Sequence, residues 1–413
     1  MSILFTKEDQ ELILERTSRD PLGVMPIWQY RGRSIVPNLT EQTREVRGFQ
    51  ILVSALYLYE EFRAASKENN IEPEQFFMLV EQAFAYSCFK HTADWPLPGK
   101  RRVTMFVNSN NVKLSTKGII LDNQLSNGIW GLYRGAAGRS ALLHDNVRCL
   151  SLGFKGEMKS SGIDDKSKNQ LFRDIKNALI NGEWDFSLDT RRELPGVLYE
   201  MFKSIPHKRI LKKYLLPPGS LAERTAELIY ENRKIFHDSI AQGNRASYRI
   251  FINKCIKHFS EETEKANFRR ILLCENFIAP VELIFRYLFK YSGKKLTDAI
   301  KDIKISVDLQ VLKDALNDFK TSGPYEGYAD GRFKLYSQAV DLSSHDALVN
   351  SILYCHNEVS QERKREPWIE MEGGKIRSLM DVYPPDVLVV DQKRTWINDY
   401  YLEPLLRIYE GLR

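Results

Sequence analysis

The spacing in this chain that most resembles a reactive site lies near its C-terminus, in segment 382–393, Val-Tyr-Pro-Pro-Asp-Val-Leu-Val-Val-Asp-Gln-Lys. The carboxylates of Asp386 and Asp391 and the amine of Lys393 are groups that hold Mg²⁺ and steady an attacking hydroxide in phosphodiester cleavage. We expect Val387–Val390 to form a buried strand. Because side chains alternate across a strand, the five-residue separation of the two acids puts them on opposite faces.

Only Asp391 and Lys393 share a face of that strand, so a magnesium site needs a second acid from elsewhere. The hairpin expected just before the strand offers Glu370, Glu372 and Asp381. Such an arrangement predicts a Mg²⁺-dependent nuclease in which Lys393 steadies the hydroxide or the phosphate. The alternative is a strand-end Asp and Lys that form a solvated pair beside an apolar core. We favour this alternative and assign no catalytic residue.

No other motif indicates a reaction or a cofactor. The sequence has neither Gly-x-x-x-x-Gly-Lys-Ser/Thr nor Gly-x-Gly-x-x-Gly, so no phosphate-binding loop is predicted. Cys255, His258 and Cys274 offer three zinc ligands where a structural site takes four, and we interpret the cysteines as core thiols. We expect no metal ligands and no cofactor, with Mg²⁺ kept only for the nuclease alternative.

The distribution of cysteines and apolar residues predicts a cytoplasmic location. The five cysteines are scattered and form no Cys-x-x-Cys pair, as in proteins of reducing compartments. We expect no signal peptide at the N-terminus. No apolar run approaches the ~18–20 residues that a membrane helix needs, so no membrane partner is expected.

Positive charge is concentrated in the middle of the chain. The chain carries +6, yet residues 201–300 hold 19 Lys and Arg against 10 Asp and Glu, which is +9. Such a region indicates a surface that faces DNA or RNA, although solvated helix faces carry similar charges. Spread along consecutive helices, these side chains would neutralise successive phosphates. The candidate nucleic-acid-binding residues are Lys208, Arg209, Lys212, Lys213, Arg245, Arg249, Lys254, Lys257, Arg269 and Arg270.

Helical periodicity dominates the chain and predicts a mainly α, multi-helical protein of two or three subdomains with a small β-hairpin near the C-terminus. Polar segments rich in glycine and serine suggest three consecutive regions: 1–155, 156–320 and 321–413. The hairpin is expected over 368–377, with Gly373 and Gly374 in a turn that needs positive φ.

Two further elements are predicted in the first region. Arg102–Val107 is β-branched and bounded by turn residues, which favours a strand. Residues 115–150 predict a helix over 122–133, a break at Gly135–Gly138 and a second helix from Arg139. That order is typical of a helix-turn-helix unit and of any packed helix pair.

Part of the N-terminal sequence resembles uncharacterised prokaryotic proteins encoded beside restriction and anti-phage systems. The resemblance lies in Asp20-Pro-Leu-Gly23, Val46-Arg-Gly-Phe49 and Gly128-Ile-Trp-Gly-Leu-Tyr-Arg134, the last leading to Arg139-Ser-Ala-Leu. It covers the first 150 residues or so and contains no catalytic motif. The resemblance implies a cytoplasmic accessory subunit that works with an ATPase or nuclease partner, and it transfers no residue roles.

Three functional hypotheses follow from the sequence. The first is a non-catalytic subunit of a multi-protein bacterial complex, in anti-phage defence or restriction, that engages DNA or RNA through its basic helices. The second is the Mg²⁺-dependent nuclease built on Asp391 and Lys393. The third is a structural adaptor whose basic surface binds an acidic protein partner.

Overall fold

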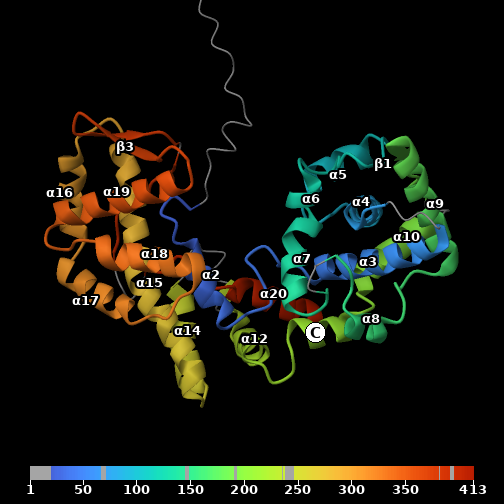
Figure 1. Ribbon diagram of the computed structural model, residues 1–413, viewed down its shortest axis with the longest axis horizontal. Coiled ribbons are helices and arrows are strands. Elements are labelled where there is room, and N and C mark those ends of the chain that lie inside the picture. Colours follow the sequence, from blue (N-terminus) through green and yellow to red (C-terminus); the bar gives the residue numbers. More distant parts are fainter. Residues whose placement is uncertain are drawn as a thin grey trace, which may run out of the picture. The chain divides into compact units, whose positions relative to one another are not determined.

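The computed structural model describes residues 20–66, 71–144, 148–189, 193–234, 236–237, 246–380, 382–390 and 395–413. The chain divides into two compact units, each assembled from segments that are distant in sequence. Unit 1 comprises Met1–Ile35 and Asn232–Tyr400, and unit 2 comprises Val36–Glu231 and Tyr401–Arg413. This division differs from the three consecutive regions expected from composition. Helices dominate both units, so the prediction of a mainly α fold is confirmed (Figure 1).

Unit 2 is a helical body with a short two-stranded sheet. Its elements are α3 (Val46–Ser66), α4 (Pro73–Thr92), α5 (Lys100–Asn108), β1 (Lys113–Ser115), α6 (Gln124–Asn127), α7 (Ile129–Arg139), α8 (Leu152–Met158), α9 (Asp165–Asn181), β2 (Glu183–Asp185), α10 (Glu193–Ser204), α11 (Lys208–Leu215), α12 (Leu221–Glu231) and α20 (Leu402–Leu412). Strands β1 and β2 pair antiparallel, with Leu114 opposite Trp184.

Helix α4 forms the centre of unit 2. It starts at Pro73, a residue suited to the first helical turn, and ends where Ala93 adopts the left-handed conformation. Nearly every side chain of α4 is buried, which is the property of a helix covered on all sides. Helices α3, α5, α7, α9 and α10 contact it.

A buried hydrogen-bond network joins α4 to the start of α7. Glu81 accepts hydrogen bonds from the backbone N–H of Ile129 and from Gln124 Nε2, both at 2.8 Å. Gln82 Nε2 donates to Gln124 Oε1 at 3.1 Å and to the carbonyl of Ser115 at 3.0 Å. Every polar atom of Glu81 therefore has a partner despite its burial.

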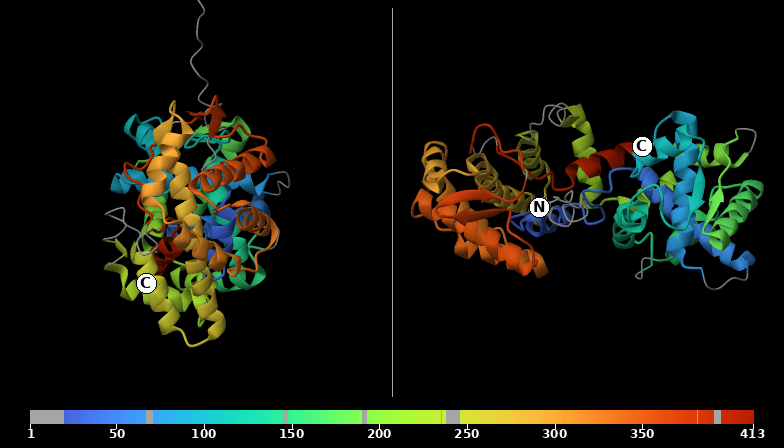
Figure 2. Two further views of the ribbon diagram at one scale, coloured as in Figure 1. Left: turned by 90° about the vertical axis from the view of Figure 1, so that its left-hand side faces the viewer. Right: turned by 90° about the horizontal axis from the view of Figure 1, so that it is seen from above.

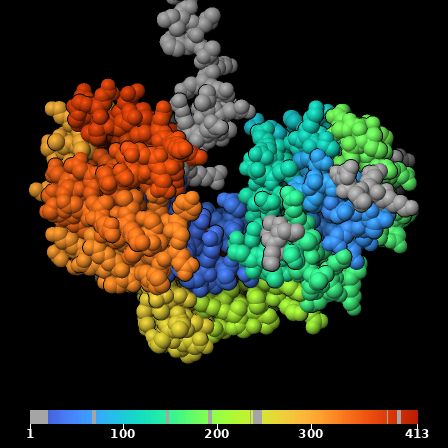
Figure 3. Space-filling view, in the orientation of Figure 1, coloured from blue at the N-terminus to red at the C-terminus, as the bar shows by residue number. Residues whose placement is uncertain are grey.

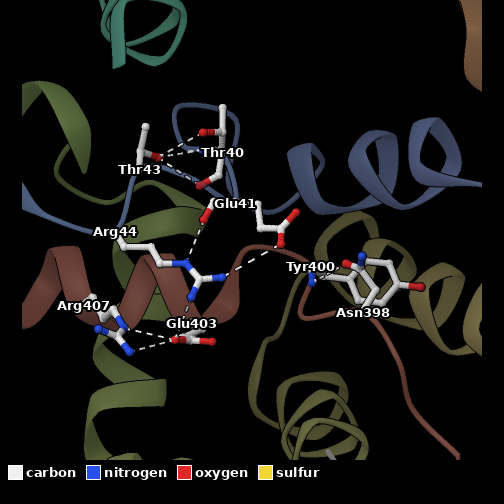
Figure 4. Close-up of polar contacts among 8 residues, drawn as sticks. All are labelled: Thr40, Glu41, Thr43, Arg44, Asn398, Tyr400, Glu403 and Arg407. Atoms are coloured by element: carbon white, nitrogen blue, oxygen red, sulfur yellow. Dashed lines mark hydrogen bonds and ion pairs between the residues drawn. The ribbon is translucent and has the colours of Figure 1, made fainter. Parts of the chain in front are cut away.

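The C-terminal helix α20 belongs to unit 2. Glu403 accepts a hydrogen bond from Arg407 Nε at 3.1 Å and forms an ion pair with Arg44 at 3.4 Å (Figure 4). Arg44 Nε also donates to the carbonyl of Glu41 at 2.9 Å. These contacts hold α20 against the segment that leads into α3.

Unit 1 consists of helices and one hairpin. Its elements are α2 (Met25–Arg33), α14 (Ala246–His258), α15 (Glu262–Leu288), the 3₁₀ turn η1 (Phe289–Tyr291), α16 (Leu296–Ser306), α17 (Leu309–Lys320), α18 (Gly327–Ala339), α19 (His345–Glu362), β3 (Ile369–Glu372) and β4 (Lys375–Ser378). Helix α15 passes through the centre of this unit and contacts α2, α14, α17 and α19 (Figures 1 and 2).

The predicted C-terminal hairpin is confirmed. β3 and β4 pair antiparallel with Glu372 opposite Lys375, and Gly373 and Gly374 have φ of 57° and 76°. These positive values are the conformation that favours glycine in a two-residue turn. The hairpin residues and α17–α19 pack into one body in the space-filling view (Figure 3).

Three local predictions were wrong. Arg102–Val107 lies within helix α5, where the buried Val103 and Val107 are four residues apart on one helical face. Residues Gly135–Gly138 do not break a helix, because α7 continues through them to Arg139, and the expected second helix does not follow in the described residues 140–144. Val387–Val390 forms no strand: Leu388 is buried, but Val387 and Val389 are 69% and 56% exposed.

No helix in the described ranges is both long and apolar enough to cross a membrane.

Candidate nucleic-acid interface

Helix α11 is fixed at its first turn by a buried amide. Gln50 Nε2 lies 2.9 Å from His207 Nδ1, and Gln50 Oε1 accepts the backbone N–H of His207 at 3.3 Å. His207 is the residue that precedes α11, and burial lowers the pKa of its imidazole. Gln50 on α3 thus holds the residue that directly precedes α11.

The sequence of α11 separates apolar and basic side chains onto different faces. Leu211 and Leu215 are fully buried and four residues apart, so they anchor the helix to the core. Arg209, Lys212 and Lys213 are related by three- and four-residue steps and therefore share another face. Anchoring by the leucines turns these cations toward solvent.

The cationic face of α11 lines an open pocket of about 680 Å³. Lys159, the residue that ends α8, contributes a fourth cation. The remaining lining residues are Gly156, Glu157, Ile210, Leu216, Pro218 and Glu223. The pocket lies entirely within unit 2 and has a volume typical of small-ligand sites.

Two of the four cations have carboxylate partners and two have none in the described part of the chain. Lys213 Nζ lies 2.7 Å from Glu157 Oε1, and Lys212 Nζ lies 3.9 Å from Glu223 Oε1. The hydrogen bond from Lys213 lowers the pKa of Glu157 and raises that of the lysine. Arg209 and Lys159 are exposed, and their side chains make neither a hydrogen bond nor an ion pair with any residue that the structure describes.

The structure brings together only part of the predicted binding set. Arg209, Lys212 and Lys213 meet at the pocket, while Lys208 is on α11 but does not line it. The candidates from α14 and α15 belong to unit 1. The sequence-expected tract of consecutive basic helices is therefore divided between the two units.

The unit 1 candidates have varied surroundings. Arg249 is partly buried: its guanidinium donates to Asn276 Oδ1 at 2.7 Å and to the carbonyl of Thr395 at 3.2 Å, and it lies over the Trp396 ring. Arg245 lies outside the described residues. Two other candidates have polar partners: Lys254 donates to Asn232 Oδ1, and Arg269 forms an ion pair with Glu262. Of the last two, Lys257 is exposed and Arg270 is half-buried.

The residues of the nuclease hypothesis are only partly described. Asp381, Asp391 and Lys393 lie outside the described residues. Glu372 lies in β3, is largely exposed and forms an ion pair with Arg377 at 3.6 Å. No cluster of three or more His, Cys, Asp or Glu suited to a metal ion occurs within the described ranges.

Sequence reasoning missed Lys159 and the two pocket acids. Lys159 and Glu157 precede α11 by about fifty residues and lie just after the boundary expected at residue 155. Glu223 did carry a local signal, since Ser220-Leu-Ala-Glu223 is a capping box. The Glu223 N–H donates to Ser220 Oγ at 3.2 Å, and its carboxylate accepts the Gly219 N–H at 2.8 Å.

Comparisons of this chain with protein families, curated proteins and solved structures found no match.

Proposed function

We propose that this chain binds nucleic acid by contacting its phosphate groups at the basic pocket of unit 2. The observation that supports the proposal is the convergence of Arg209, Lys212, Lys213 and Lys159 on one pocket. Two of these cations, Arg209 and Lys159, have no counter-ion among the described residues, so an incoming phosphate need not displace an acid to reach them.

The chemistry of the pocket suits phosphate oxygens. A guanidinium presents a planar fork of N–H donors that can bind two phosphate oxygens together, and lysine ammonium groups add compact point charges. Backbone contacts of this kind supply most of the affinity of sequence-independent binding. The proposal therefore concerns the phosphate groups of DNA or RNA and predicts no preference for particular bases.

The test is binding of fluorescent single-stranded DNA and RNA oligonucleotides to the full chain at low salt. We expect the double charge reversal Arg209→Glu with Lys159→Glu to weaken binding at least about tenfold, a loss of 1.4 kcal/mol. A matched control is Arg101→Glu with Lys117→Glu. It changes the charge of unit 2 equally at exposed residues that do not line the pocket.

The same assay separates the proposal from an adaptor that binds an acidic protein. Poly-glutamate should compete poorly with the oligonucleotide if phosphates are the true ligands. Equal competition would favour an acidic protein partner, and no retention of DNA or RNA at low salt would contradict the proposal. Membership of a larger bacterial complex stays a prediction of the sequence resemblance.

A further inference from the structure

Two carboxylates, each held by other groups, line the unit 2 pocket together with its four cations. Glu157 comes from α8 and is held by Lys213 and by the Tyr214 hydroxyl, which donates to it at 3.1 Å. Glu223 comes from α12 and is held by the Gly219 N–H at 2.8 Å. Because other groups hold both acids, we expect them to stay in the pocket lining when a ligand enters.

The formal charge of the pocket is small in spite of its four cations. The lining residues comprise two lysines and an arginine from α11, Lys159, and the two acids, which gives a net +2. A phosphate monoester carries about −1.5 to −2 at neutral pH, because its second pKa is near 6. An internal phosphodiester carries one charge, and its strand continues on both sides.

The acids of the lining penalise a strand that runs through the pocket. An internal phosphodiester brings two neighbouring phosphates close to a pocket lined by the carboxylates of Glu157 and Glu223, and like charges in proximity repel. A terminal phosphate enters with nucleic acid on one side only. It also brings a second charge to Arg209 and Lys159, the two cations without a counter-ion in the described part of the chain.

From this arrangement we infer that the pocket binds a phosphate monoester, the phosphorylated end of a nucleic-acid strand. The inference rests on the proposed function and specifies which part of the polymer occupies the pocket. Arg209 and Lys159 bind the terminal phosphate oxygens, while Lys212 and Lys213, already paired with acids, contribute longer-range attraction. A free nucleotide monophosphate has the same chemistry and is a second source of this ligand.

The experiment compares three oligonucleotides of one sequence, with a 5′-phosphate, a 3′-phosphate or hydroxyls at both ends, bound to the full chain at fixed salt. We expect one phosphorylated oligonucleotide to bind at least about tenfold more tightly than the unphosphorylated one, as one additional charge-assisted hydrogen bond would provide. The preference should disappear in Arg209→Gln with Lys159→Gln and persist in Arg101→Gln with Lys117→Gln.

The outcomes distinguish this inference from the proposed function. Equal affinity for all three oligonucleotides, still lowered by Arg209→Gln with Lys159→Gln, would overturn the end-binding inference and leave backbone binding in place. No binding of any oligonucleotide would overturn both. Adenosine monophosphate added as competitor distinguishes the two sources of the phosphate monoester. If it displaces the phosphorylated oligonucleotide at a concentration near that of the oligonucleotide itself, the pocket binds free nucleotides, and strand-end binding is contradicted.

Discussion

Arg209 and Lys213 lie one helical turn apart on α11 and line the same pocket, yet only Lys213 has a carboxylate partner there, with its Nζ 2.7 Å from Glu157 Oε1. Exposed ion pairs of this kind contribute little to stability. Under the proposed function, Glu157 therefore affects ligand binding more than folding, because it neutralises a cation at the pocket.

Replacing that acid should strengthen nucleic-acid binding. In Glu157→Gln, Lys213 is released toward the phosphates and a repulsive charge is lost, so we expect affinity for single-stranded oligonucleotides to rise several-fold. Measured over a salt series, the slope of log K against log salt should steepen by ~0.7, which is one more phosphate contact. Glu183→Gln is the matched control, since Glu183 also accepts a lysine Nζ at 2.7 Å but lies on β2. Unchanged or weaker binding by Glu157→Gln would contradict the role given to this acid.

Arg249 should prove structural, although its sequence position made it a nucleic-acid candidate. Its hydrogen bonds to Asn276 and Thr395 are lost in Arg249→Gln, and we expect unit 1 to be destabilised by ~1–3 kcal/mol, measured by urea unfolding. Oligonucleotide affinity should not change under conditions where the variant is folded. Lys257→Gln, at an exposed position of α14, should alter neither quantity. If folded Arg249→Gln binds oligonucleotides more weakly than the wild type, Arg249 contacts nucleic acid and the structural role given to it is contradicted.

Two glycines of α7 should respond oppositely to alanine. A Cβ at Gly131 would lie 2.0 Å from the carbonyl oxygen of Ser126, whereas a Cβ at Gly135 would meet only Arg139 Nη1, at 3.6 Å. We expect Gly131→Ala to destabilise unit 2 by ~2 kcal/mol or more, because backbone must move. Gly135→Ala should stabilise it by ~0.5–1 kcal/mol through helix propensity. Thermal unfolding compares the two, and equal shifts would show that α7 does not approach Ser126 in this way.

The buried Glu81 should make stability depend on pH. Burial raises the pKa of Glu81 from 4.5 to about 7. The folded state therefore binds the proton more tightly than the unfolded chain, and stability falls as pH rises from 4.5 toward 7. A shift of this size corresponds to ~3 kcal/mol.

The variant Glu81→Gln isolates this contribution. Glutamine removes the titration and one acceptor for Gln124, so the variant should be less stable than the wild type at pH 5 and should lose most of that deficit by pH 8. Urea unfolding at the two pH values measures the difference, in which the other titrating groups cancel. Parallel pH profiles for the two proteins would show that Glu81 does not titrate in this range.

The sequence predicted elements better than their assembly. The Gly373-Gly374 turn is a local signal, and it is confirmed. The strand prediction for Arg102–Val107 was wrong because its β-branched residues also fit a helical period, which puts Val103 and Val107 on one buried face. The strand predicted over Val387–Val390 is not formed, because a strand also needs a neighbouring strand to pair with and the propensity of these residues does not provide one.

Only part of the candidate interface could be predicted from the sequence, because only part of it is local. Three pocket cations lie within five consecutive residues of α11, and the density of positive charge there predicts them. Lys159 and Glu157 come from another helix, and only the packing of α8 on α11 brings them to the pocket. After Glu231 the chain leaves unit 2 and continues in unit 1, so the cations of α11 belong to one unit and those of α14 and α15 to the other. The amino-acid composition does not predict this division.

The salt dependence of oligonucleotide binding tests the central claim most directly. If Arg209 and Lys159 contact phosphates, Arg209→Gln with Lys159→Gln should reduce the slope of log K against log salt by ~0.7–1.4 for a single strand, and Arg101→Gln with Lys117→Gln should leave it unchanged. Equal reductions in the two double variants would mean that only net charge matters and would contradict a phosphate-binding pocket on α11.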